Sequence, residues 1–477
     1  MNYKLKISFV IVIILVSLIN CIHAGEYVVA VDCAKVIEKR IRPLNGVNLG
    51  PLCYRGTIDL SQYHRELKIP LTRLHDVVWL NADAVDISTI FRDFRDDPEL
   101  ADNYDFRITD DYIQAIINTG SQIVYRLGES IEHTPKKYRV NPPKDLEKWA
   151  KICLGIIRHY NKGWANGFHH NIKYWEIWNE PDVKPAMWTG TDEQYFELYG
   201  ITSKLIKNNF PDVKVGGPAL GNPVIIEGER FKPSEFAAKF LKYCKENNAP
   251  LDFFSWHCYT GKPQVIAQKA KAVRSILDEF GFKNTESHLN EWNYLPNDDW
   301  APMLTGNGAL KEKWYEEMGG PFGAAFLVSV LTMLQDLPVD AANFYTGEIQ
   351  GFGLFNYYGT PKKNFYGMKA FTSLLETPVR LESSLSIPDS TVLAGANENK
   401  NKANVLIAFN KKRYFQFRFE FKNAFWKNNT LCEVFAVDSE KNLELMTRKT
   451  LASSQPYIDL DVKSPSVLLI ALSPAAD

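Results

Sequence analysis

The stretch that decides the fold is residues 173–182, which read KYWEIWNEPD. An apolar strand runs into Pro181, and the proline ends regular strand pairing there. Alternation along a strand places Glu176, Trp178 and Glu180 on one face. Glu180 therefore falls at the carboxyl end of the strand, where a barrel of parallel strands builds its active site.

Seven further apolar segments of this kind occur along the chain, with helix-like segments between them. The strand candidates are residues 44–50, 69–75, 122–127, 172–178, 213–217, 251–257, 286–291 and 341–345. The helix candidates are residues 146–160, 193–208, 233–247, 264–280 and 322–335. This alternation predicts an α/β fold, a (β/α)₈ TIM barrel, over residues 44–376. A doubly wound open sheet is the competing fold.

After Thr377 the pattern changes to one that is typical of antiparallel sheet. Residues 414–421, YFQFRFEF, alternate strictly between phenylalanine and polar side chains. A period of two marks a strand with one buried face. We therefore predict a β-sandwich accessory domain over residues 377–477, and we expect a strand within residues 25–43 to join it.

The first 24 residues have the composition of an export signal. Lys4 and Lys6 precede an apolar run at residues 7–19, which is shorter than the roughly 20 residues of a membrane span. We predict a signal peptide over residues 1–24, cleavage after Ala24, export of the mature chain and no membrane span after cleavage. The alternatives are an uncleaved anchor and a lipid-modified Cys21.

Charge and motif searches exclude several classes of function. The chain has 55 Lys and Arg against 56 Asp and Glu, a net charge of −1, without the basic stripe of a nucleic-acid reader. It has no nucleophile elbow, phosphate loop or zinc-protease motif, and its cysteines lack metal-binding spacing. One disulfide bond is possible in an exported chain, and the sequence does not say which cysteines would form it. We expect no nucleic acid, no metal and no organic cofactor.

A second glutamate completes a pair. Residues 288–294 read HLNEWNY, which places Glu291 at the end of the seventh predicted strand. The fourth and seventh strands of an eight-stranded barrel are nearly opposite, so Glu180 and Glu291 face each other across its mouth. Cleavage of a glycosidic bond needs one protonated and one ionised carboxyl. We expect Trp178 to desolvate Glu180 and Arg73 to keep Glu291 charged.

The motifs at the ends of the predicted strands resemble those of a known family. WEIWNEPD and HLNEWN look like the acid/base and nucleophile motifs of the retaining glycoside hydrolases of clan A. The segments TRLH at residues 72–75 and SWHCY at residues 255–259 resemble the second- and sixth-strand motifs of family 39. That family includes β-xylosidases and α-L-iduronidases. The resemblance covers about residues 44–375.

The resemblance implies roles for particular residues. Glu180 would be the general acid/base and Glu291 the nucleophile, while Asn179 would hold the 2-hydroxyl of the sugar. Strict alternation turns Asn179 away from Glu180, so a bulge or twist is needed to bring both into one pocket. Arg73 and His75 would line the opposite wall.

Further residues complete the implied pocket. His257 and Tyr259 share a strand face, and Tyr259 would hydrogen-bond the nucleophile. Trp188 and Trp292 are candidates for stacking on sugar faces. The chain departs from the family at Asp76, where glycine is frequent, and at Asn290, where threonine is common.

The sequence thus predicts an exported retaining glycosidase that acts on an oligosaccharide or polysaccharide. The resemblance implies an equatorial glycosidic bond, as in a β-D-xyloside or an α-L-iduronide. Two alternatives stay open: a transglycosidase using the same two glutamates, and a catalytically silent carbohydrate-binding protein on the same scaffold.

Overall fold

The computed structural model describes residues 27–53, 57–80, 83–132, 134–228 and 230–475. The predicted signal peptide lies outside the described residues. The chain forms two compact units, one made of residues 43–372 and the other of the flanking segments up to residue 42 and from residue 373.

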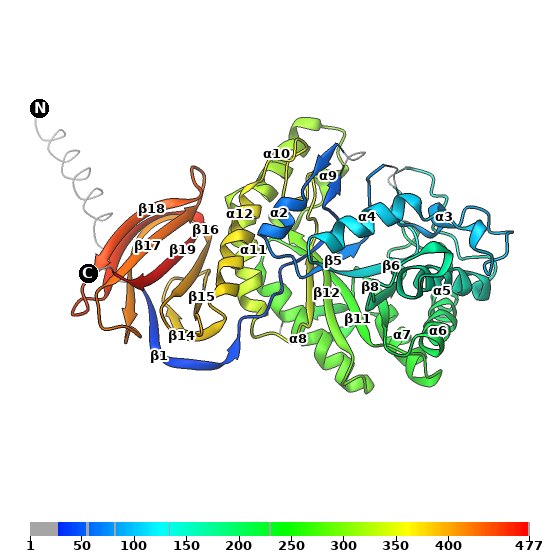
Figure 1. Ribbon diagram of the computed structural model, residues 1–477, viewed down its shortest axis with the longest axis horizontal. Helices are drawn as coiled ribbons and strands as arrows, with labels where there is room; N and C mark the ends of the chain where they lie inside the picture. Colours follow the sequence, from blue (N-terminus) through cyan, green and yellow to red (C-terminus); the bar gives the residue numbers. More distant parts are fainter. Residues whose placement is uncertain (1–26, 54–56, 81–82, 133, 229, 476–477) are drawn as a thin grey trace, which may run out of the picture. The chain divides into compact units, whose positions relative to one another are not determined.

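The first unit is built on a closed barrel of eight parallel strands (Figure 1). In chain order the barrel strands are β2 (Gly46–Asn48), β5 (Leu71–Leu74), β6 (Gln122–Leu127), β7 (Tyr174–Ile177), β8 (Lys214–Leu220), β11 (Phe253–Thr260), β12 (Glu286–Tyr294) and β13 (Ala341–Phe344). Each pairs in parallel with its neighbour in the chain order, and β13 closes onto β2. The predicted barrel and all eight of its strands are confirmed, and the open sheet is excluded.

Helices alternate with these strands and lie around the outside of the barrel (Figure 1). The longer helices are α4 (Arg107–Asn118), α5 (Leu146–Lys162), α6 (Asp192–Asn209), α7 (Glu235–Glu246), α8 (Pro263–Phe280), α10 (Gly308–Gly319), α11 (Pro321–Leu334) and α12 (Lys363–Thr372). The sequence predictions found five of them and missed α4, α10 and α12. Side-chain caps begin α5, α6, α7 and α10, and Thr191 forms a capping box with Gln194 at the start of α6.

Short elements decorate the loops of the barrel unit. They are the helices α2 (Ser61–Glu66), α3 (Ile87–Ile90) and α9 (Ala301–Leu304), the 3₁₀ turns η1 (Ala101–Asn103), η2 (Trp164–Asn166) and η3 (Pro296–Asp298), and the hairpins β3 (Leu52–Cys53) with β4 (Ile58–Asp59) and β9 (Val224–Glu227) with β10 (Arg230–Pro233). One close approach in the barrel needs glycine: a Cβ at Gly216 of β8 would lie 2.2 Å from the Phe253 carbonyl of β11.

The second unit is a seven-stranded sheet that is antiparallel except where β1 meets β16. Its strand order is β1 (Val28–Arg40), β14 (Val379–Leu385), β15 (Ser390–Ala396), β16 (Ala403–Lys422), β19 (Tyr457–Pro474), β17 (Thr430–Val437) and β18 (Asn442–Leu451), and the turn η4 (Ser373–Glu376) precedes β14. The two layers of the predicted sandwich are parts of this one sheet, because β16 pairs with β15 over residues 403–409 and with β1 over residues 418–422.

The alternating phenylalanines of β16 form the core of the sheet unit. Phe415, Phe417, Phe419 and Phe421 are buried, whereas Tyr414 on the opposite face is 67% exposed. Apolar burial on one face of a strand is the main stabilising contribution of such a sheet. The pattern read from the sequence is therefore the pattern of burial.

The cysteines of the described segments are all buried and free, so the disulfide bond that the sequence allowed is not formed among them.

The described residues contain no single helix that is long and apolar enough to cross a membrane. The bent pair α10 and α11 together has the length and composition of a membrane span.

Candidate active site

The fourth barrel strand ends earlier than alternation predicts. β7 stops at Ile177, and both Trp178 and Glu180 have left-handed backbone, with φ of 68° and 47°. These two residues break the period of two, so Asn179 and Glu180 both reach the inner side of the barrel mouth. The expected common face of Trp178 and Glu180 is wrong: the Trp178 indole turns outward and donates to the carbonyl of Met187.

The seventh strand carries a matching irregularity. Trp256 of β11 pairs with Leu289 and His257 pairs with Glu291, so Asn290 is one extra residue in β12. Such a bulge re-aims the side chains around it. Asn290 donates to the Glu176 carboxylate inside the barrel, and Glu291 points into the mouth. The two predicted carboxylates thus reach one site through two departures from regular strand geometry.

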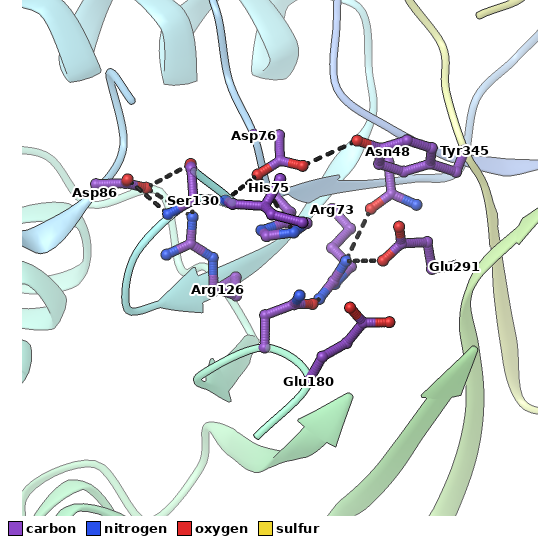
Figure 2. Close-up of polar contacts among 12 residues, drawn as sticks. Asn48, Arg73, His75, Asp76, Asp86, Arg126, Ser130, Glu180, Glu291 and Tyr345 are labelled. Atoms are coloured by element: carbon purple, nitrogen blue, oxygen red, sulfur yellow. Dashed lines mark hydrogen bonds and ion pairs between the residues drawn. The ribbon is translucent and has the colours of Figure 1, made fainter. Parts of the chain in front are cut away.

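The guanidinium of Arg73 is the centre of the site. It is fully buried and donates through Nε to Glu176, 2.7 Å away. Its two terminal nitrogens donate to Asn179 at 2.7 Å and Asn48 at 3.1 Å. Nη1 also lies 3.4 Å from Glu291 Oε2. Figure 2 shows Arg73, Glu180 and Glu291 converging at this point.

His257 joins the two glutamates. Its Nδ1 lies 2.8 Å from Glu180 Oε1 and 3.2 Å from Glu291 Oε2. These two contacts limit the distance between the carboxylate oxygens to at most 6.0 Å, the sum of the two. Tyr259 donates its hydroxyl to the other oxygen of Glu291 at 2.6 Å.

The two glutamates lie in different surroundings, which shift their pKa values differently. Burial raises the pKa of Glu180 from 4.5 to about 7, and the charge of Arg73 only partly opposes this. Burial and the neighbouring Glu180 raise the pKa of Glu291, and His257, Arg73 and the Tyr259 hydroxyl only partly oppose this rise. Burial lowers the pKa of His257, which favours a neutral ring. Of the two carboxyl groups, Glu180 is therefore the one better suited to hold a proton near pH 7.

The cavity over these residues has a volume of about 460 Å³. Its lining includes His75, Asp76, Glu180, His257, Tyr259, Glu291, Lys269, Trp300, Tyr345, Gln350 and Phe352. A volume of this size suits a small polar ligand. Arg73 and Asn179 are almost fully buried directly below these lining residues, where Arg73 donates to the Asn179 side chain.

Neither of the two predicted stacking residues lines this cavity. Trp188 is fully buried against Trp178 and Tyr195 and donates to the Thr191 carbonyl. Trp292 is fully buried against Phe326 and Phe344. Neither indole can stack on a sugar from these positions. Trp178 packs on Trp149 and Trp188, so it does not desolvate Glu180 as we expected.

Sequence reasoning missed several residues of the site. Glu176 was placed on the inward face but given no role, yet it neutralises Arg73. Asn48 ends the first strand and Tyr345 follows the eighth, positions at which barrel enzymes place functional groups. No local pattern pointed to Trp300, which reaches the cavity from the turn before α9.

The described segments contain no cluster of three or more His, Cys, Asp or Glu side chains arranged to hold a metal ion. Carboxylates, hydroxyls, amides and imidazoles line the cavity instead. These groups suit the recognition of hydroxyl-rich ligands and acid–base chemistry on them.

Comparison with known proteins shows the family of this chain. The model of the family described as glycosyl hydrolases family 39 matches residues 38–412. The chain belongs to this family. It is therefore a glycosidase, and its substrate is a carbohydrate.

Three relatives illustrate the match. A β-xylosidase of Caldicellulosiruptor saccharolyticus is 26% identical over 376 residues, covering 72% of this chain and 69% of its own. A β-xylosidase of Geobacillus stearothermophilus is 26% identical over 325 residues, which span 60% of this chain and 59% of that enzyme. The structure of a glucosidase from Croceicoccus marinus superposes with a TM-score of 0.77 at 22% identity, covering 94% of this chain and 99% of that one.

The raised pKa of Glu180 predicts a pH-dependent gain of stability on its replacement. Folding takes up a proton between pH 4.5 and about 7, so ionisation of the buried carboxyl opposes folding above that window. Glu180→Gln should raise the free energy of unfolding by about 3 kcal/mol at pH 8 and change it little near pH 4.5. Urea denaturation at both pH values measures this.

The matched control is Glu197→Gln, which changes an exposed glutamate on α6. It should alter stability by less than about 0.5 kcal/mol at either pH. A gain from Glu180→Gln that is the same at both pH values would contradict a buried carboxyl with a raised pKa.

Proposed function

We propose that this glycosidase cleaves an equatorial glycosidic bond with net retention, through a covalent glycosyl–enzyme. Glu291 is the nucleophile and Glu180 the general acid/base. The observation that carries this proposal is the short bridge through His257, which holds an oxygen of each carboxylate within 6.0 Å of the other. Retaining enzymes hold the two carboxyl groups about 5–5.5 Å apart, and inverting enzymes about 6.5–9.5 Å.

The first step forms the glycosyl–enzyme. Glu291 Oε2 attacks the anomeric carbon while protonated Glu180 transfers its proton to the glycosidic oxygen, and the leaving group departs as an alcohol. Arg73 and Tyr259 hold the Glu291 carboxylate in the position from which it attacks. We propose that Asn179, whose side chain Arg73 orients, hydrogen-bonds the 2-hydroxyl of the sugar.

The second step releases the sugar. Glu180, now ionised, removes a proton from water, and the water oxygen attacks the anomeric carbon from the face that the leaving group left. The bond to Glu291 breaks and its carboxylate is restored. Two inversions give net retention, and both glutamates return to their starting protonation states.

The names of the relatives support a β-xyloside-like substrate. Both curated relatives above are β-xylosidases. The silent-binder alternative is disfavoured because both carboxylates and their supporting groups are in place. A transglycosidase shares the first step, and an added alcohol that captures the glycosyl group in preference to water would identify it.

We further propose export of the chain. The charged start, short apolar core and small residue at the end of residues 1–24 support a cleaved signal peptide.

Proton NMR of the first-formed sugar tests the mechanism. Early in the reaction, before mutarotation, the product should have the same anomeric configuration as the substrate, because two displacements occur at one carbon. A spontaneously hydrolysed sample gives the control ratio of anomers. The opposite anomer as first product would remove Glu291 from the nucleophile role.

Glu180→Ala should slow hydrolysis according to the leaving group. With an alkyl or sugar leaving group, which needs a proton to depart, the rate should fall about 10²- to 10⁴-fold. With a dinitrophenyl leaving group the first step should be nearly unaffected, and azide should restore the second step. Glu197→Ala, on the surface of α6, is the control. Equal losses for both leaving groups without azide rescue would contradict the acid/base role.

Export predicts a mature chain that begins at Gly25. Mass spectrometry of the protein from the native host measures the mass of the N-terminal peptide. A cytoplasmic chain that retains Met1 would contradict the proposal.

A further inference from the structure

Asp76 is a third carboxylate in the wall of the cavity, and the reaction described above does not use it. It lies two residues after the end of β5 and has left-handed backbone with φ of 58°. Its Oδ1 accepts from the Ile131 amide at 2.8 Å, and its Oδ2 accepts from the Tyr345 hydroxyl at 2.9 Å. His75 Nε2 lies 3.4 Å from Oδ1. A carboxylate has about four acceptor positions, so further hydrogen bonds from a ligand can be accepted.

A buried ion pair fixes the loop that holds Asp76. Arg126 and Asp86, both without exposure, lie 2.7 Å apart. Asp86 also accepts from the amide of Ser130 at 2.7 Å and from its hydroxyl at 2.8 Å. Ser130 precedes Ile131, so this network sets the direction of the amide that binds Asp76 (Figure 2). The carboxylate is thus held from two sides before any ligand arrives, which lowers the entropy cost of binding.

Contacts across the mouth show which part of a substrate Asp76 faces. Asp76 accepts from Tyr345, the Tyr345 ring packs edge-on against Tyr259, and Tyr259 donates to Glu291. Glu180 lies at the end of β7, where its amide donates to the Ala219 carbonyl of β8. The leaving group must lie beside the acid Glu180. The sugar ring that bonds to Glu291 therefore extends toward Asp76.

We propose that Asp76 recognises this sugar ring, the glycone, by accepting hydrogen bonds from hydroxyl groups remote from the anomeric carbon, and that it selects neutral glycones over uronic acids. This inference rests on the proposed function for the orientation of the substrate. A carboxylate on the glycone would face Asp76, and two negative charges that lie close together in a buried site repel each other. Two cations act on Asp76, Arg73 and Arg126, but each is already paired with a buried carboxylate of its own. The cavity-lining cation Lys269 lies beside Cys258 of β11.

The experiment compares Asp76→Gly and Asp76→Asn with the unmodified enzyme. Glycine suits the left-handed backbone at this position, and asparagine keeps the shape without the charge. Asp96→Gly, at an exposed loop position, is the matched control. The substrates are 4-nitrophenyl glycosides: the best neutral glycone in a panel, its analogues lacking the 3- or 4-hydroxyl, and the uronic acid with the same ring configuration.

The unmodified enzyme should prefer the neutral glycone to the uronic acid. Asp76→Gly should lower kcat/KM for the neutral glycone about 10- to 100-fold, the effect of losing a hydrogen bond to a charged acceptor. That loss should disappear with the deoxy analogue whose hydroxyl Asp76 binds. Asp76→Asn should lower the ratio of kcat/KM for the neutral glycone to kcat/KM for the uronic acid. Asp96→Gly should match the unmodified enzyme throughout.

Two results would overturn the inference. One is an equal loss for the parent and both deoxy analogues, which indicates a structural role through Tyr345. The other is an unmodified enzyme that prefers the uronic acid. Binding of the free monosaccharides, measured by saturation-transfer NMR, separates this inference from the proposed function. Neutral-sugar binding that Asp76→Gly weakens, in a chain that hydrolyses no glycoside, would support Asp76 and refute the retaining hydrolase. Binding unchanged in Asp76→Gly would refute the role of Asp76.

Discussion

The buried ion pair between Arg73 and Glu176 is the interaction on which the rest of the site depends. Both side chains are without exposure, and their nitrogen and oxygen atoms lie 2.7 Å apart. Burying two charges is costly unless each is paired and hydrogen-bonded. Arg73 meets this requirement by also binding Asn48 and Asn179, and Glu176 by accepting from Asn290. Removal of any one partner would leave part of a charge uncompensated inside the barrel.

This arrangement explains how two neighbouring carboxyl groups differ in acidity. Glu291 lies within reach of Arg73, Tyr259 and His257, all of which favour its ionised form. Glu180 shares only the His257 contact and has weaker opposition to the effect of burial, which raises its pKa to about 7. Two carboxyl groups with different environments can take the roles of acid and nucleophile at the same pH. Arg73, on a strand that carries neither glutamate, thus contributes to the environment of both carboxyl groups.

A second buried pair, Arg126 with Asp86, repeats this principle one strand further along. It lies behind the loop after β6 rather than beside Glu291, and it orders Ser130 and the amide that binds Asp76. The two arginines come from adjacent strands, β5 and β6. Each of these buried ion pairs holds a neighbouring group of the site in one orientation. Rigid support of this kind is what a site for a flexible, hydroxyl-rich ligand requires.

The sequence by itself determined the barrel, the antiparallel sheet and the two glutamates. These rest on local regularities: strand–helix alternation, the alternating phenylalanines of β16, and glutamate at two predicted strand ends. It did not determine how the strand ends turn. The left-handed residues at Trp178 and Glu180 and the extra residue Asn290 arise where the fourth and seventh strands meet their neighbours.

The tertiary structure alone decided which aromatic side chains reach the cavity and which residues support the charges. Trp188 and Trp292 are large and lie next to motif residues, which made them candidates, but they fill the space between strands and helices. Asn48, Glu176 and Tyr345 are distant from one another in the chain and gain their roles only when the barrel closes. A period of two or of 3.6 reports which side of an element is buried. It carries no information on which buried polar groups meet across the barrel, because those contacts depend on every strand at once.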